Sequence, residues 1–247
     1  MDVPELTLRP QLLAAGFSDD ELRRLVRTGG LTPVRRAVYV QGGVPDDVLA
    51  RHTLHVLAAM GELAGDAVAS HVSAAVLHGL PIWRVRLDRV HVTRPRRGGG
   101  RRGALVHVHP AALHPGEVVT IAGIPVTSLA RTVADLARTL PFEQAVVLAD
   151  AATSRRRPGR VEKEDLLAVL DAAPRRPGTR AARRAVEFSN GLSESVGESR
   201  SRVAIAAVGL PPPVLQWEVR AASTGAFIGR VDVGWPGCGR WASSTAS

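Results

Sequence analysis

A run of three prolines at positions 211–213 most constrains what this chain can fold into, because proline fixes φ and has no backbone N–H to donate. The run separates a helical pattern from an extended one. Before it, residues 195–209 have the pattern of a helix that ends at Gly209. After it, residues 214–219 and 227–235 have the pattern of two β-strands. The C-terminal part is therefore predicted to be a helix followed by a β-hairpin.

This helix and hairpin each carry a carboxylate. Glu198 lies in the first turn of the helix and Asp232 in the second strand. Mg²⁺ prefers one or two carboxylates together with phosphate oxygens of a substrate, so the pair is typical of the beginning of a magnesium-dependent nuclease site. The alternative is structural. Ser195 and Glu198 form the Ser-x-x-Glu pattern of a capping box, and Arg202 follows Glu198 by one helical turn.

The string Gly-Glu-Ser-Arg-Ser-Arg at 197–202, the Leu-Pro-Pro-Pro at 210–213 and the Gly-Arg-Val-Asp at 229–232 resemble the restriction-endonuclease-like family related to very-short-patch repair nucleases. The resemblance implies a DNA endonuclease in which Glu198 and Asp232 are the catalytic, Mg²⁺-binding residues. That family has a third strand with Glu-x-Asp or Glu-x-Lys, which residues 236–247 lack. We therefore expect a truncated, inactive nuclease-like domain with no cofactor as given, and a frameshift near residues 237–240 as the cause. Mg²⁺ would be the cofactor of a complete domain.

The first 45 residues have the outline of a winged helix-turn-helix. A short helix is expected from Leu6 to Ala15, a capping box at residues 18–21 begins a second helix, and a basic strand follows over residues 31–40. Arginines of the second helix and the wing are the predicted DNA contacts: Arg23, Arg24, Arg27, Arg35 and Arg36. The alternative is a small protein-interaction module, because residues 1–50 hold six basic and seven acidic side chains.

Residues 6–40 resemble the N-terminal domain of the AbiEi antitoxins, on the strings Gly-Phe-Ser at 16–18, Gly-Leu-Thr-Pro-Val at 30–34 and Val-Tyr-Val at 38–40. Residues 69–83 and 124–137 resemble the middle of the same proteins. These antitoxins are the transcription-regulating halves of type IV toxin–antitoxin systems. The resemblance implies double-stranded DNA and a toxin protein as partners. Ala37 is a departure, since the family usually has glycine before Val-Tyr.

Residues 46–173 are expected to form an α/β middle domain. Within it, residues 89–93 and 105–109 are predicted to pair as a hairpin with a glycine- and arginine-rich tip. The arginines of the tip are candidates for phosphate contacts: Arg96, Arg97, Arg101 and Arg102. A solvated loop is the alternative. The tip lacks the lysine and the following helix of a P-loop.

Histidines and one ion pair complete the middle region. His107 and His109 face the same side of a predicted strand, but the sequence lacks both a His-Glu-x-x-His pattern and a cysteine among them. We therefore expect no metal site from these residues or from their neighbours in sequence, His71, His78 and His114. Arg131 and Asp135 lie one turn apart on a capped helix, where a structural role is expected.

Charge and composition limit the class of protein. The formal net charge of +9 and the sequence pI of about 11.3 favour a polyanionic partner such as nucleic acid. Cys238 is the only cysteine, which favours a reducing compartment, and the absence of a long apolar run or a signal peptide predicts a cytoplasmic protein without a membrane span.

The sequence thus predicts an α/β (α+β) chain with domains at 1–45, 46–173 and 178–247. Its preferred function is that of a DNA-binding protein resembling antitoxin regulators. A magnesium-dependent endonuclease and a module that binds a partner toxin are the alternatives.

Overall fold

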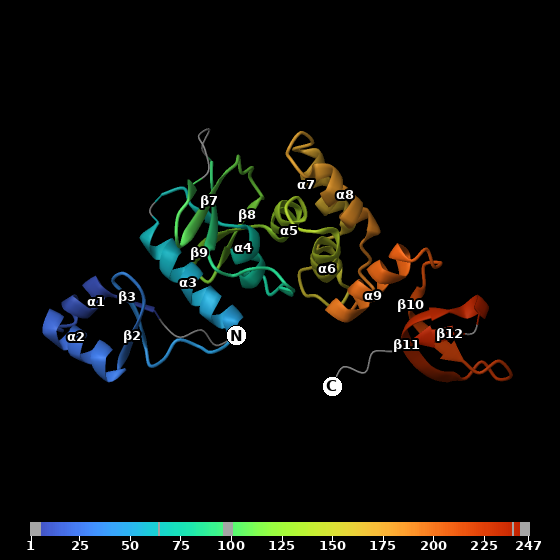
Figure 1. Ribbon diagram of the computed structural model, residues 1–247, viewed down its shortest axis with the longest axis horizontal. Helices are drawn as coiled ribbons and strands as arrows, with labels where there is room; N and C mark the ends of the chain where they lie inside the picture. The colour runs from blue at the N-terminus through green and yellow to red at the C-terminus, as the bar shows by residue number, and fades with distance from the viewer. Residues whose placement is uncertain (1–5, 64, 96–100, 239, 243–247) are drawn as a thin grey trace. The chain divides into compact units, whose positions relative to one another are not determined.

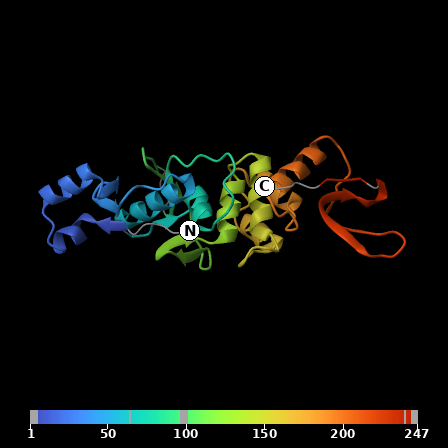
Figure 2. The ribbon, with the colours of Figure 1, turned by 90° about the horizontal axis from the view of Figure 1, so that it is seen from below.

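The computed structural model describes residues 6–63, 65–95, 101–238 and 240–242. It confirms the predicted α+β class and divides into two compact units (Figures 1 and 2). Unit 1 comprises Met1–Gly79 and Val85–Ser128, and unit 2 comprises Leu80–Arg84 and Leu129–Ser247. The division therefore falls inside the predicted middle domain, whose first part groups with the N-terminal elements. In the part of the chain that the structure describes, no helix is both long and apolar enough to cross a bilayer.

Unit 1 begins with two helices and three short strands. They are β1 (Leu6–Leu8), α1 (Arg9–Ala14), α2 (Asp19–Thr28), β2 (Leu31–Arg35) and β3 (Val38–Gln41). The strands form an antiparallel sheet in the order β1-β3-β2, so α2 and the β2–β3 hairpin occupy the places predicted for the second helix and the wing. The prediction of a helix from Leu6 was wrong, because Leu6 and Leu8 pair with β3 and pack on its apolar side chains.

Helix α2 begins at the predicted capping box and ends at a glycine. At its start, Ser18 Oγ accepts the Glu21 backbone N–H at 3.3 Å while Glu21 Oε2 accepts the Ser18 N–H at 2.8 Å. At its end, Gly29 has a φ of 79°, the left-handed conformation that glycine adopts without steric cost. Leu22 on the inner face joins a small core with Leu12 and Leu31.

The turn between β2 and β3 contains a strained residue, Ala37, with a φ of 60°. A left-handed conformation costs a non-glycine residue about 1–2 kcal/mol. We expect Ala37→Gly to raise the free energy of unfolding by about 0.5–1 kcal/mol, after the larger entropy of glycine in the unfolded chain is subtracted. Urea denaturation measures the change. Ala204→Gly, at an exposed position inside a helix of unit 2, is the control and is expected to destabilise by a similar amount. If Ala37→Gly lost stability as the control does, the conclusion that Ala37 is strained would be wrong.

Helix α3 (Val48–Glu62) lies between two apolar clusters and contributes to each. Leu54 and Ala58 pack with Val34, Val38 and Val40 of the small sheet. Another set of its side chains belongs to the core of a second sheet: Val56, Ala59 and Met60. Asp47 caps the helix by accepting the Ala50 N–H at 2.7 Å.

The second sheet of unit 1 has six strands in the order β6-β7-β5-β4-β9-β8. Its elements are β4 (Val68–Ala69), the helix α4 (His71–Leu77), β5 (Val90–Arg94), β6 (Arg101–Arg102), β7 (Val106–Pro110), β8 (Val118–Ile121) and β9 (Ile124–Thr127). The predicted hairpin between residues 89–93 and 105–109 was wrong, because β5 and β7 are parallel. The hairpin is instead β6–β7, closed by a tight turn in which the Gly103 N–H donates to the Val106 carbonyl.

Unit 2 is a group of helices followed by a small sheet (Figure 1). The helices are α5 (Leu129–Ala137), α6 (Phe142–Thr153), α7 (Lys163–Asp171), α8 (Thr179–Phe188) and α9 (Val196–Ala207). The sheet contains β10 (Val214–Arg220), β11 (Phe227–Trp235) and β12 (Arg240–Ala242), with a 3-10 turn at Pro236–Cys238 before β12. The helix and hairpin predicted around the proline run are confirmed.

The expectation that β11 has no third strand beside it was wrong. Residues 240–242 pair antiparallel with Val233, Gly234 and Trp235. The 3-10 turn reverses the chain directly after Trp235, which allows this short pairing even though the sequence differs from the family pattern.

Candidate functional site

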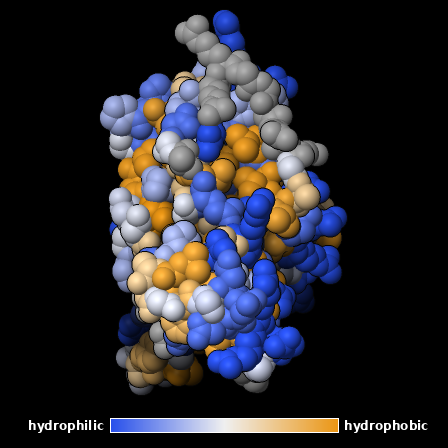
Figure 3. All heavy atoms as spheres, turned by 90° about the vertical axis from the view of Figure 1, so that its left-hand side faces the viewer, coloured by the Kyte–Doolittle hydropathy of each residue, from blue (hydrophilic) through white to orange (hydrophobic). Residues whose placement is uncertain are grey.

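Arginines gather on the outer face of α2. Leu22 is buried, whereas Arg23, Arg24 and Arg27 are exposed, because the helix turns its apolar stripe toward the small core. Arg23 Nη1 lies 2.6 Å from Asp20 Oδ1, but both side chains are largely exposed and such a pair adds little stability. Figure 3 shows large hydrophilic areas between apolar patches on the face that it presents to the viewer. The outer face of α2 therefore presents cationic side chains to solvent.

The first turn of α2 is acidic, and its carboxylates have partners within the same part of unit 1. Arg9 Nη2 donates to both oxygens of Asp19, at 2.6 and 2.7 Å. The pKa of Glu21 is lowered, first by the hydrogen bond from the Ser18 backbone and then by that from its hydroxyl. These negative charges also suit the positive end of the helix dipole. Phosphate contacts from α2 would therefore come from its later turns.

The wing holds the other two predicted DNA-contacting arginines. Arg36 is exposed at the turn between β2 and β3. The Arg35 side chain is mostly buried, and its Nη2 lies 3.1 Å from Glu62 Oε2 at the end of α3. The structure therefore brings four of the five predicted arginines to the surface and pairs the charge of Arg35 inside unit 1.

The arginine-rich tip of the second sheet is only partly described. Arg96 and Arg97 lie outside the described residues. Arg101 and Arg102 form β6, the edge strand that pairs with β7. Their predicted phosphate contacts stay a prediction.

The two carboxylates of the predicted nuclease site lie in unit 2. Glu198 is buried, and both of its carboxylate oxygens accept hydrogen bonds. Oε1 accepts the Ser195 hydroxyl at 2.9 Å, and Oε2 accepts the Glu194 N–H at 3.0 Å and the Gln216 amide at 2.9 Å. Because Leu215 pairs with Val233 and Trp217 with Val231, the residue between them, Gln216, lies across from Asp232.

These contacts favour the structural interpretation of Glu198. The Ser195 side chain caps the helix as the alternative predicted, but the Glu198 carboxylate accepts the Glu194 N–H and the Ser195 hydroxyl instead of completing a capping box with the Ser195 N–H. The expected ion pair between Glu198 and Arg202 is replaced by another, because Arg202 Nη1 bonds Asp150 Oδ2 at 2.7 Å and Nη2 bonds the Phe188 carbonyl at 2.6 Å. Gln216, which sequence reasoning missed, holds Glu198 from the side of the hairpin.

A buried ionic cluster surrounds Asp135. Its Oδ2 accepts from Arg131 Nε at 2.7 Å, and its Oδ1 accepts from Arg138 at 2.8 Å and from Arg176 at 3.2 Å. The cluster links α5 to the segment before α8. The expected structural role of the Arg131–Asp135 pair agrees with this buried position.

Histidines from three elements meet in unit 1. His71 begins α4, His91 lies on β5, and His107 and His109 lie on β7. The parallel register places His91 beside His107 and Thr93 beside His109. Burial lowers the pKa of His91 to about 4, and the nearby His107 adds to the effect. Sequence reasoning considered His71, His107 and His109 but missed His91, because the parallel register of β5 and β7 that brings His91 beside them was not predicted.

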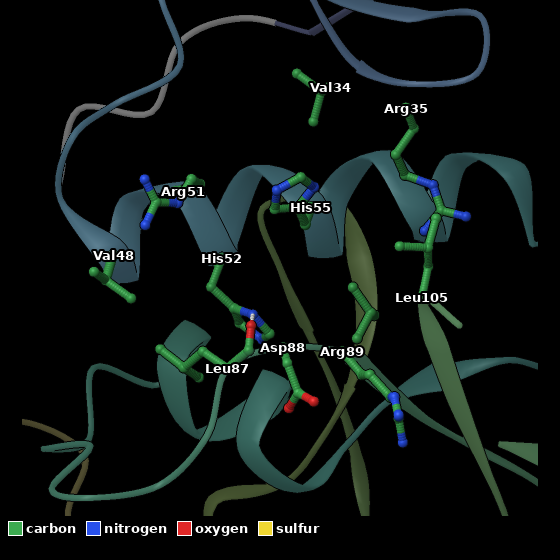
Figure 4. Close-up of a pocket in the computed structure, with 11 residues that line it drawn as sticks. Val34, Arg35, Val48, Arg51, His52, His55, Leu87, Asp88, Arg89 and Leu105 are labelled. Atoms are coloured by element: carbon green, nitrogen blue, oxygen red, sulfur yellow. Dashed lines mark hydrogen bonds between the residues drawn. The ribbon is translucent and has the colours of Figure 1, made fainter. Parts of the chain in front are cut away.

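A buried histidine from α3 lies behind this group. The His52 ring contacts the Leu87 carbonyl through Nδ1 at 3.2 Å (Figure 4). Its Nε2 lies 3.0 Å from the Ser73 hydroxyl. The Ser73 oxygen also accepts the His91 N–H at 2.8 Å. Burial lowers the pKa of His52 to about 4, so the ring is neutral at pH 7 and fixes the backbone of β5 through Ser73.

Comparison with known proteins places this α+β chain in a family. No family model matches the sequence. The uncharacterized proteins MT2308 of Mycobacterium tuberculosis strain CDC 1551 / Oshkosh and Rv2248 of strain H37Rv are each 33% identical to it over 213 residues, which cover 85% of this chain and 72% of the relative. The chain belongs to the same family as these two mycobacterial proteins.

One solved structure is similar over most of the chain. The crystal structure of the RV2827C protein from Mycobacterium tuberculosis matches over 91% of this chain and 86% of that chain, with a TM-score of 0.49 and 14% sequence identity.

Proposed function

We propose that this protein binds double-stranded DNA through α2 and the wing of unit 1. The observation that carries the proposal is the exposure of three arginines on α2, with Arg36 exposed at the turn between β2 and β3. In this proposal α1, α2 and the β2–β3 hairpin act as a winged helix-turn-helix. In this arrangement the second helix enters the major groove, and cations beside it contact phosphates.

The charges of this surface support contact with a polyanion. The acidic side chains of α2 are near its first turn, where Asp19 pairs with Arg9 and Asp20 with Arg23. Arg24 and Arg27 lie beyond that turn, three residues apart and therefore on neighbouring parts of the helix surface. They are the residues that we expect to contribute most to phosphate binding.

The test is the salt dependence of binding to duplex DNA, followed by fluorescence anisotropy. Each phosphate contact contributes about 0.9 to the slope of log affinity against log salt concentration. Replacing Arg24 and Arg27 together with alanine is expected to flatten the slope by about two units. It should also weaken binding about 30-fold at 0.15 M salt, if one contact is lost per arginine.

The matched control replaces two exposed arginines of unit 2, Arg155 and Arg180, which removes the same charge from the chain. We expect this variant to retain most of its slope. Equal losses in the two variants would show that net charge alone drives binding, and an unchanged slope in the α2 variant would move recognition elsewhere. If the chain binds no duplex, the protein-interaction alternative, with a toxin as the partner, is favoured.

The endonuclease alternative has less support. Glu198 is buried, and three of the acceptor positions of its carboxylate are used by Ser195, Glu194 and Gln216, so a Mg²⁺ ion would compete with these hydrogen bonds. We therefore assign Glu198 to the support of α9 and the hairpin, and we do not include cleavage in the proposed function.

A further inference from the structure

The histidines of unit 1 form a group whose ring nitrogens converge. His71, His91 and His109 each offer one ring nitrogen, and the three atoms lie within 4.8 Å of one another. His109 Nε2 and His91 Nδ1 are 3.1 Å apart. The rings of His71 and His109 are stacked, with their centroids 3.6 Å apart. The three residues come from α4, β5 and β7, which the fold of unit 1 brings together.

We propose that His71, His91 and His109 bind one divalent transition-metal ion of the class that Zn²⁺ represents. A set of imidazole nitrogens suits Zn²⁺, Cu²⁺ or Ni²⁺ and excludes Mg²⁺ and Ca²⁺, which prefer oxygen ligands. Two nitrogens at about 2.0–2.1 Å from a tetrahedral zinc ion lie about 3.4 Å apart, close to the separation of His91 and His109. This proposal concerns a different part of unit 1 from α2 and is independent of DNA binding.

The backbone at His71 supports a site. His71 has a φ of 51°, a left-handed conformation that costs a non-glycine residue of order 1–3 kcal/mol. The residue before it, Ser70, is at the N-cap position but makes no side-chain cap to the helix. Its hydroxyl lies instead 3.1 Å from His71 Nδ1. A proton donated from Nδ1 to Ser70 places the lone pair on Nε2, which is the usual way in which a second residue prepares a histidine ligand.

The strand that carries His91 is fixed from behind. Ser73 accepts the His91 N–H at 2.8 Å and is itself held by His52 at 3.0 Å. His91 is therefore positioned by a buried polar network. Because the rings of His71 and His109 are nearly parallel, with 14° between their planes, one must rotate for its lone pair to point at a common ion. Binding would also replace the proton shared between His91 and His109.

The alternative is a group of neutral, stacked histidines with no ligand. It accounts for the short ring contacts but gives no reason for a strained His71 or for a cap residue that bonds the ring instead of the helix. A metal ion accounts for both, because it would stabilise the conformation that presents His71 to β5 and β7.

The test is a zinc titration of the full chain, made without a histidine tag, against a chromophoric chelator. We expect one Zn²⁺ per chain. His91→Ala and His109→Gln should each weaken binding on the order of 100-fold or more, whereas His114→Ala, at an exposed position outside the group, should leave it unchanged. Ser70→Ala should weaken binding about 10-fold, as expected for a residue that orients a ligand.

The visible spectrum of the Co²⁺-loaded chain is the second measurement, since tetrahedral Co²⁺ absorbs strongly and reports the ligands directly. Circular dichroism shows whether each variant is folded, and His109→Gln, at a half-buried position, serves if His91→Ala unfolds. Failure of the wild-type chain to bind Zn²⁺, or wild-type affinity in folded His109→Gln, would overturn the proposal.

Discussion

Replacing Asp135 with alanine is expected to lower the free energy of unfolding by about 3–5 kcal/mol, because it leaves buried cations without their counter-charge. The side chains of Arg131, Asp135 and Arg138 are 4%, 4% and 5% exposed, respectively. Burial lowers the pKa of Arg138, while the Asp135 carboxylate acts against that effect. Without the carboxylate, the cost of removing these guanidinium groups from water is no longer offset.

Urea denaturation followed by circular dichroism measures this loss. The control is Asp171→Ala, which removes a carboxylate that pairs with Arg183 at an exposed position of unit 2. Such pairs contribute about 0–1 kcal/mol, so the control should be nearly as stable as the wild type. Equal effects of the two substitutions would mean that the Asp135 cluster is more hydrated than its burial indicates.

A second large effect is expected at Gly178, directly before α8. Gly178 has a φ of 82°, and a Cβ atom there would lie 2.0 Å from the carbonyl oxygen of Arg138. Alanine would therefore meet both the cost of a left-handed conformation and a clash with backbone that has to move. Together these are expected to destabilise unit 2 by about 3–5 kcal/mol.

Gly159→Ala separates the two causes. Gly159 has a φ of 65°, but a Cβ atom there would meet nothing within 4 Å. We expect this variant to lose only the conformational part, about 1–2 kcal/mol. The difference between the urea midpoints of the two variants measures how much of the destabilisation of Gly178→Ala comes from the clash with the Arg138 carbonyl. No difference would contradict this clash.

Local signals predicted much of the fold correctly. The capping box at Ser18 and the side-chain cap at Ser195 mark where α2 and α9 begin, since a cap depends on residues three positions apart. Strands β10 and β11 could be predicted because their apolar and polar side chains alternate and because prolines precede Val214. In each case the forces that decide the structure act within a few residues.

Features that depend on distant partners were not predicted. No residue near Val90 indicates that β5 pairs parallel with β7. The direction follows from β6, which lies between them in the sequence and pairs antiparallel with β7. The histidine group depends on that direction, and therefore sequence spacing did not reveal it. In the same way, Gln216 reaches Glu198 only after the hairpin has folded against α9.

Helix α3 has a consequence for how unit 1 folds. Its Leu54 contributes to the core of the small N-terminal sheet, and its Val56 contributes to the core of the six-stranded sheet. If α3 unfolds, both cores lose the side chains that it contributes. The three-stranded N-terminal sheet and the six-stranded sheet should therefore behave as one cooperative folding unit, in which a fluctuation that opens the first also exposes the amides of the second.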